Sequence, residues 1–296
     1  MPFQNASFIE SHMFKDRKFQ SYYNMKKAVY LIMCKNFYSA LMSSHVSLSL
    51  CVLLTCLFFI DAVDLVAQSS PATGSLHDTE ADRAEEFLVQ YREKAMKRWS
   101  QDIETLEQRD VVQRDPEGAI LFIGSSSIRR WDTIEIDMAP YQVVQRGYGG
   151  AKYSDLAVFA KRLIHPHKYN ALVVFVANDV QGKSGDHSPQ QVEECARYIV
   201  EVSRKHQPQS PVFFIEITPT RKRFSAWPLI RKANARLQQL ALSIPDVYFI
   251  ATADHFLDPS GNPRDELFVD DQLHLNSNGY KKWSTLIRRE LDEAFQ

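Results

Sequence analysis

The chain has 296 residues, of which 45% are apolar and 24% are charged, and its formal net charge is −1. These values are typical of a soluble globular protein and exclude a disordered or fibrous chain. The sequence also lacks a long run of Lys and Arg, the clustered cations that bind nucleic acid phosphates, so we expect no nucleic acid partner.

The first 67 residues bear on where the protein acts. Residues 46–60 form a nearly unbroken apolar run, which has the length of a signal-peptide core and is shorter than the roughly 20 residues of a bilayer span. Lys26 and Lys27 precede this run, and Ala67 offers a small residue for cleavage. We therefore expect an exported protein, either secreted or periplasmic. The alternative is that the segment stays uncleaved and anchors the protein in a membrane.

Residues 68–110 are predicted to form a polar linker followed by an amphipathic helix. From about residue 79 to residue 109, apolar side chains that include Leu88, Trp99 and Ile103 recur mostly at steps of three or four. Such a stripe is typical of a helix with one buried face. We expect this helix to pack on the main domain.

Cysteine usage argues against a disulfide bond in the mature protein. Three of the four cysteines lie within the first 67 residues, which leaves only Cys195. Cys195 falls in a predicted helix, where we expect it to act as a small buried hydrophobe.

The remaining chain, residues 111–296, alternates short apolar runs with helical patterns. Apolar runs without polar alternation are typical of strands that are buried on both faces. The order therefore predicts an α/β domain, a three-layer α/β/α sandwich with a central parallel sheet of about five strands. The predicted strands are 119–123, 141–144, 171–176, 211–217 and 247–251, and the predicted helices are 153–163, 189–206, 227–243 and 276–295.

Four polar clusters lie at or near ends of these elements. They are residues 124–127, 146–150, 177–179 and 270–276. In an open parallel sheet, ligands bind at the carboxyl ends of the strands, where the connecting loops gather. We expect these four segments to meet at one edge of the sheet.

The residue types in these clusters fit nucleophilic catalysis. A serine hydroxyl attacks an ester only when an imidazole takes its proton, and a carboxylate must orient that imidazole. Ser126, His274 and Asp271 can fill these three roles. The backbone N–H groups of Ser126 and Gly150 and the side-chain amide of Asn178 can donate to the oxyanion that forms. This chemistry requires neither a metal nor an organic cofactor.

The four clusters together resemble the sequence blocks of the SGNH (GDSL-type) hydrolase superfamily, in its GSSS-bearing branch. The matching blocks are 122–127, 143–150, 177–179 and 271–274, in the family's order. The resemblance implies a flavodoxin-like hydrolase fold, with Ser126, Asp271 and His274 as the catalytic triad and Ser126, Gly150 and Asn178 as the oxyanion hole. It also implies a serine esterase.

An exported setting favours short-chain or acetyl esters on a carbohydrate or small molecule as substrates.

The sequence departs from the family at two positions. Ser125 replaces an aspartate beside the nucleophile, and Val176 replaces the glycine of the third block. Neither departure removes a residue that the reaction needs, but Val176 alters the wall that the substrate approaches.

Two other functions stay open at the level of sequence. A fold of this kind can serve as a glycan-binding module without turnover. A serine-rich loop before a helix can also hold the phosphate of a nucleotide or a flavin.

Asp270 is an alternative to Asp271 as the acid of the triad. The three-residue step from Asp271 to His274 matches the family pattern and favours Asp271. The sequence does not indicate an oligomeric state.

The other histidines of the domain carry no obvious chemistry. His165 and His167 flank a proline in a loop, and His187 and His255 lack an acid at a recognisable spacing. We expect these four to be solvated loop residues.

Overall fold

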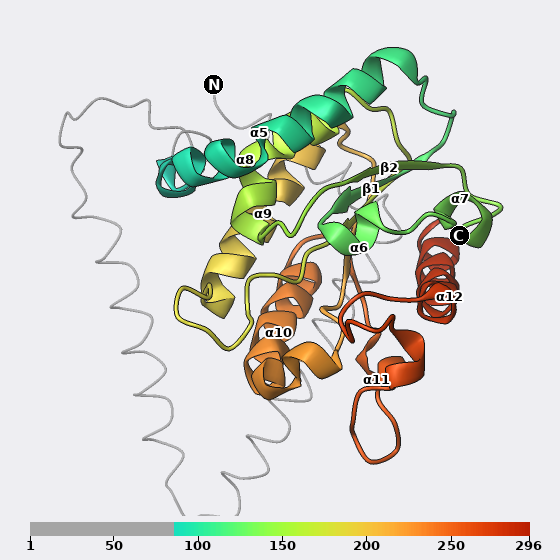
Figure 1. The fold of residues 1–296 in the computed structure, drawn as a ribbon. Coiled ribbons are helices and arrows are strands. Elements are labelled where there is room, and N and C mark those ends of the chain that lie inside the picture. The colour runs from blue at the N-terminus through green and yellow to red at the C-terminus, as the bar shows by residue number, and fades with distance from the viewer. Residues whose placement is uncertain (1–85) are drawn as a thin grey trace, which may run out of the picture. The chain divides into compact units, whose positions relative to one another are not determined.

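The structure, a computed structural model, describes residues 86–296 (Figure 1). The predicted leader (1–67) and the start of the next predicted segment lie outside the described residues, so cleavage and anchoring stay predictions. Within the described range, no helix combines the length and apolar character needed to cross a membrane.

Five parallel strands form one sheet in the order β2-β1-β3-β4-β5. The strands are β1 (Ile120–Gly124), β2 (Val143–Gly147), β3 (Ala171–Phe175), β4 (Val212–Ile215) and β5 (Val247–Ile250). The predicted parallel sheet of five strands is therefore confirmed. The chain leaves β1 towards β2 on one side and later returns to β3 on the other. This change of direction is a topological switch point, where open α/β sheets bind their ligands.

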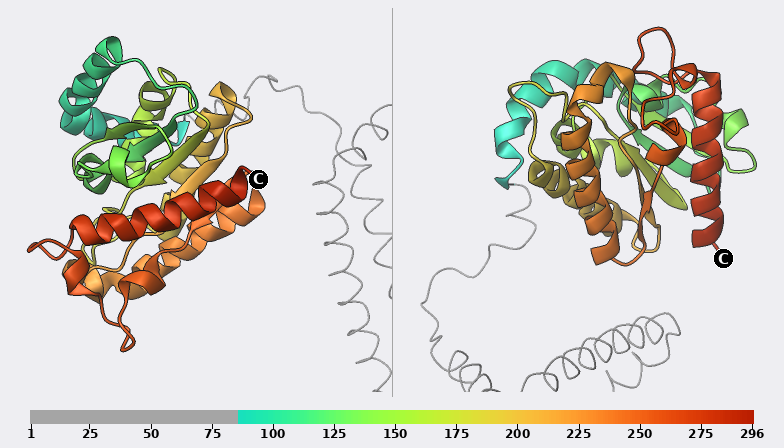
Figure 2. Two further views of the ribbon diagram at one scale, coloured as in Figure 1. Left: turned by 90° about the vertical axis from the view of Figure 1, so that its right-hand side faces the viewer. Right: turned by 90° about the horizontal axis from the view of Figure 1, so that it is seen from below.

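Helices cover both faces of the sheet (Figure 2), as the three-layer prediction requires. One face packs against α5 (Val89–Val112), α8 (Tyr153–Ile164), α9 (Pro189–His206) and α10 (Trp227–Ser243). The opposite face packs against α12 (Ser277–Ala294) and the one-turn helices α6 (Ser126–Arg129), α7 (Ile134–Asp137) and α11 (Ala253–Phe256). Two 3₁₀ helices, η1 (Arg221–Ala226) and η2 (Asp265–Leu267), lie in the loops.

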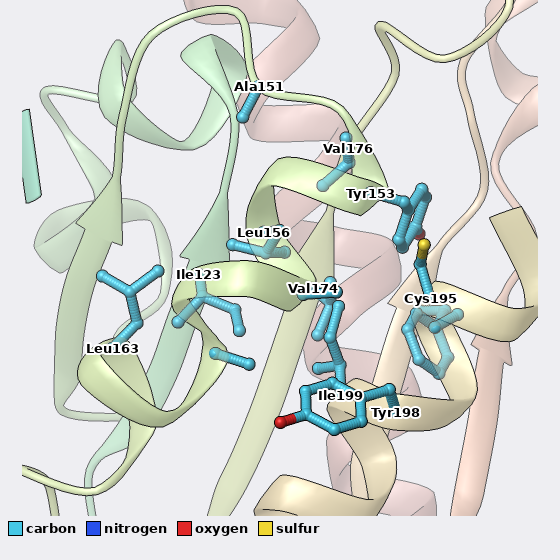
Figure 3. Packing of buried hydrophobic residues seen from close by; sticks show 14 of the residues in the cluster. Ile123, Ala151, Tyr153, Leu156, Leu163, Val174, Val176, Cys195, Tyr198 and Ile199 are labelled. Carbon is cyan, nitrogen blue, oxygen red and sulfur yellow. The ribbon is translucent and has the colours of Figure 1, made fainter. Parts of the chain in front are cut away.

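The strands contribute side chains to two separate cores because successive residues of a strand point to opposite faces. Leu121 and Ile123 of β1 lie in the core beneath α8 and α9, whereas Ile120 and Phe122 lie in the core beneath α12. Figure 3 shows part of the first core, in which the free thiol of Cys195 is buried. Both faces of β1 are buried, which explains its apolar run without alternation.

The first described helix is part of this domain's core. Ala95, Trp99 and Ile103 of α5 are buried in the same cluster as the side chains of α8. Arg162 of α8 also donates two hydrogen bonds of 2.6 Å to the carboxylate of Glu107. The predicted packing of this helix on the main domain is therefore observed for residues Val89–Val112.

Candidate active site

Ser126 stands at the carboxyl end of β1, an inner strand of the sheet that lies between β2 and β3. A Cβ atom at Gly124 would lie 2.0 Å from the carbonyl oxygen of Phe175, and Gly124 has φ +151°. Only glycine fits this close approach without strain. Ser125 then donates its backbone N–H to the same carbonyl at 3.0 Å, and α6 begins at Ser126. The strand thus turns sharply into a helix and leaves Ser126 at the edge of the sheet.

His274 and Asp271 lie in the loop between η2 and α12. The loop is fixed by backbone hydrogen bonds from Val269 N–H to the His274 carbonyl (2.9 Å) and from Asn276 N–H to the Leu267 carbonyl (3.0 Å). Asn276 also caps α12, because its side-chain oxygen accepts from the backbone N–H groups of residues 278 and 279. The imidazole therefore extends from a loop that these hydrogen bonds hold in place.

The structure brings Ser126, His274 and Asp271 into one hydrogen-bonded chain. Ser126 Oγ lies 2.9 Å from His274 Nε2, and His274 Nδ1 lies 2.6 Å from Asp271 Oδ2. A carboxylate can only accept, so the ring proton sits on Nδ1 and leaves Nε2 as the acceptor for the serine hydroxyl. This tautomer is the one that a general base needs.

Asp271 is held as a carboxylate by its own loop. Its Oδ1 accepts the backbone N–H groups of Leu273 and His274, each at 2.9 Å. Burial raises the pKa of Asp271, but these bonds and the one from the His274 ring outweigh it and lower the pKa to about 2. Arg130 lies 3.5 Å from Asp271 Oδ2, and both side chains are nearly half exposed, so this ion pair is weak.

Gly150 and Asn178 lie next to each other in the loops after β2 and β3. A Cβ atom at Gly150 would be 3.5 Å from Asn178 Nδ2, and that nitrogen donates to the carbonyl oxygen of Ala151 at 3.1 Å. Tyr148 donates its backbone N–H to the Gly124 carbonyl at 3.0 Å, which joins the β2 loop to the end of β1. Asn178 lines the same cavity as Ser126 and His274.

The cavity at Ser126 is small, with a free volume of about 20 Å³. This is little more than the room that one water molecule needs. Besides the polar residues already named, the cavity is lined by apolar side chains that include Ile217, Phe268 and Leu275. Val176, the departure from the family's third block, is fully buried in the core beneath α8 and α9 and does not line this cavity, so the expectation that it alters the wall facing the substrate is wrong.

Arg223 is a cavity residue that sequence reasoning missed. It belongs to η1, and its guanidinium donates to the Ala177 carbonyl at 2.6 Å and to the side-chain oxygen of Asn178. Burial lowers the pKa of this side chain, while Asp179 and Asp186 raise it. The run Arg221-Lys222-Arg223 looks like an ordinary solvated surface, and it matches none of the four sequence blocks.

The expectation of solvated loop histidines is wrong for His167 and His187. His167 is buried, with Nδ1 2.9 Å from Asp115 Oδ2, and His187 Nδ1 lies 2.9 Å from Oδ1 of the fully buried Asp179. The partner of His167 is distant in sequence, and no simple spacing rule reveals either pair. His165 and His255 are exposed, as expected, although His255 lies in the one-turn helix α11 and not in a loop.

Comparison with known proteins bears on both fold and family. The model of the GDSL-like lipase/acylhydrolase family matches residues 127–282, just over half of the chain. No curated protein matches the sequence.

The solved structures that resemble this chain include the following three. Their sequence identities are low, so they indicate a shared fold and not a shared activity. A provisionally assigned platelet activating factor from Streptococcus pneumonia is 19% identical, with a TM-score of 0.58 over 71% of this chain and 97% of its own. A GDSL-like lipase from Bacteroides thetaiotaomicron is 16% identical, with a TM-score of 0.56 over 65% of this chain and 98% of its own. A provisionally assigned acylhydrolase from Bacteroides fragilis is 18% identical, with a TM-score of 0.55 over 68% of this chain and 97% of its own.

The family match covers the loops that carry Gly150, Asn178, Asp271 and His274, and it begins one residue after Ser126. The sheet order and the two helical layers agree with the same fold. The chain belongs to the GDSL-like lipase/acylhydrolase family and is a serine hydrolase that acts on ester bonds.

Proposed function

We propose that the protein removes short acyl groups, acetyl above all, from esters of a carbohydrate or small molecule, with Ser126, His274 and Asp271 as its catalytic triad. The observation that carries the proposal is the pair of short contacts on the two nitrogens of His274, 2.9 Å to Ser126 Oγ and 2.6 Å to Asp271 Oδ2. A loop that merely bound phosphate or flavin would have no need of an imidazole held between a hydroxyl and a carboxylate.

The reaction follows from this geometry in two half-reactions. Neutral His274 takes the proton of Ser126 as its oxygen attacks the ester carbonyl, and it then protonates the leaving alcohol. A water molecule, activated by the same imidazole, attacks the acyl-enzyme and releases the acid. Asp271 keeps the ring in its tautomer and stabilises its charged form in both halves.

The oxyanion formed in each half needs fixed donors. We assign this role to the backbone N–H groups of Ser126 and Gly150 and to the Asn178 amide. One hydrogen of Asn178 Nδ2 is taken by the Ala151 carbonyl, so the second is the one that can reach the substrate.

We expect Asn178→Ala to fold normally and to lower kcat by about 100- to 1,000-fold, because one oxyanion donor is lost. Initial rates on nitrophenyl acetate, beside thermal melting of both proteins, measure the two effects separately. An unchanged kcat would remove Asn178 from the oxyanion site.

The small cavity supports a small acyl group. The cavity, walled by Ile217, Phe268 and Leu275, holds little more than one water molecule in this structure, and such close apolar walls favour a short acyl group over a long one. The alcohol side is proposed only as a class, a glycan or small molecule. Export and the attachment of residues 1–67 to a membrane also stay proposals.

A chain-length series tests the acyl preference. We expect kcat/KM to fall at least about tenfold from nitrophenyl acetate to the octanoate, since each extra methylene meets the cavity wall. Ile217→Ala, which removes part of that wall, is expected to raise the octanoate rate relative to the acetate rate. Rates that climb with chain length in the wild-type protein would contradict the acetyl preference. Release of acetate from acetylated xylan or pectin, with Ser126→Ala as the blank, then tests the carbohydrate class.

A further inference from the structure

Arg223 is a largely buried cation at the active site whose role the triad and the oxyanion donors leave open. It reaches the cavity from η1, more than forty residues along the chain from the loop that it contacts. Its Nη1 donates to the Ala177 carbonyl at 2.6 Å, and its Nη2 donates to Asn178 Oδ1. Both acceptors are uncharged, so the side chain is not held there by an ion pair with either of them.

The contacts on the Asn178 amide fix which way it faces. A guanidinium can only donate, so the end that meets Arg223 must be the oxygen. The carbonyl of Ala151 can only accept, so the end that meets it must be the nitrogen. Without Arg223, only the contact with the Ala151 carbonyl would still distinguish the two ends of the amide, so its orientation would be held less firmly. A flip would turn the donor away from the site.

The charge of Arg223 also affects the strength of the donor. Hydrogen bonds from a charged donor are about twice as strong as neutral ones, and in a poorly solvated site such bonds polarise one another. A cation on Oδ1 withdraws electron density from the amide and makes the Nδ2 hydrogens more positive. A more positive donor stabilises a developing oxyanion better than it stabilises the neutral ester carbonyl.

We propose that Arg223 is a positioning residue, which holds the Asn178 amide with its nitrogen towards the reacting carbonyl and strengthens it as a donor. The inference rests on the proposed role of Asn178 in the oxyanion hole. It predicts that Arg223 acts on kcat through Asn178 and contributes little by itself to KM.

Arg221 provides a matched control on the same 3₁₀ helix. Its guanidinium is exposed and pairs with Asp265 at 3.0 Å, away from Asn178. Arg221→Ala therefore removes the same charge from the same element without touching the amide.

A double-mutant cycle tests the proposal. Arg223→Met keeps the apolar stem, and we expect it to lower kcat about 10- to 100-fold with KM unchanged within about twofold. In the Asn178→Ala background the same substitution should change kcat by less than about twofold. Arg223→Lys should recover part of the loss, because an ammonium still donates one bond. Arg221→Ala should match the wild-type protein.

Two outcomes would overturn the proposal. One is an equal loss of kcat from Arg223→Met in the wild-type and Asn178→Ala backgrounds. That result would mean that Arg223 acts on the fold or on the substrate and not through Asn178. The other is an unchanged kcat for Arg223→Met together with an inactive Ser126→Ala variant. Arg223 would then not be a positioning residue, while the proposed function would stand. Full turnover by Ser126→Ala would overturn both together.

Discussion

Replacing Ser126 by alanine is expected to lower kcat by roughly 10⁴- to 10⁶-fold, because only the oxyanion donors and substrate binding would remain. His274→Ala should cost about as much, since the hydroxyl at 2.9 Å from Nε2 is a weak nucleophile without its base. The double variant should be hardly worse than either single one, because the two groups act as a unit. Progress curves on nitrophenyl acetate at high enzyme concentration give all three values.

Ser127→Ala is the matched control for this prediction. Its backbone carbonyl accepts a hydrogen bond from Tyr280 at 2.9 Å, a contact that the substitution leaves in place. Ser127 lines the same cavity, but no described hydrogen bond joins its hydroxyl to Ser126, His274 or Asp271, so we expect the kcat of this variant to stay within about threefold of wild type. If Ser127→Ala lost activity and Ser126→Ala retained it, the nucleophile would be Ser127 and not Ser126.

The second large effect is expected from Asp271→Asn, which should lower kcat by roughly 10³- to 10⁴-fold. The amide keeps the shape of the carboxylate, but its NH₂ group facing Nδ1 would favour the wrong tautomer of His274. Because the pKa of Asp271 is about 2, the wild-type carboxylate is ionised throughout the range from about pH 4 to pH 9. The loss should therefore be present at every pH in that range.

Asp270→Asn is the control for Asp271. Asp270 is exposed, and the carboxylate that lies 2.6 Å from His274 Nδ1 is that of Asp271. We expect Asp270→Asn to retain wild-type kcat on nitrophenyl acetate. If instead Asp270→Asn carried the loss and Asp271→Asn stayed active, the acid would have been assigned to the wrong residue of the pair.

Much of the fold could be predicted because burial on both faces leaves a clear pattern in the sequence. Strand β1 shows no alternation of polar and apolar residues, because its successive side chains face two different apolar cores. The long helices α9 and α10 begin and end where their patterns do, at Pro189–His206 and Trp227–Ser243. One-turn helices such as α6 and α11 were not predicted, because four residues are too few to show a helical period.

The grouping of candidate site residues could be predicted for a topological reason. Parallel strands deliver their loops to one edge, so residues after β1, β2 and β3 are neighbours in any such sheet. Arg223 could not be predicted in this way. Its contact with Asn178 depends on how η1 folds back over the loop after β3, and charge runs of this kind usually face solvent. The contact between buried His167 and partly buried Asp115 was missed for the same reason, since the two residues meet only in the folded chain.

Whether Ser126 is an activated nucleophile is tested most directly by the mass of the folded protein after reaction with a fluorophosphonate, a reagent that modifies activated serines. We expect a single adduct on the wild-type protein, located by peptide mapping on Ser126, and no adduct on Ser126→Ala. An unmodified wild-type protein, or an adduct that persists in Ser126→Ala, would show that Ser126 is not the activated serine.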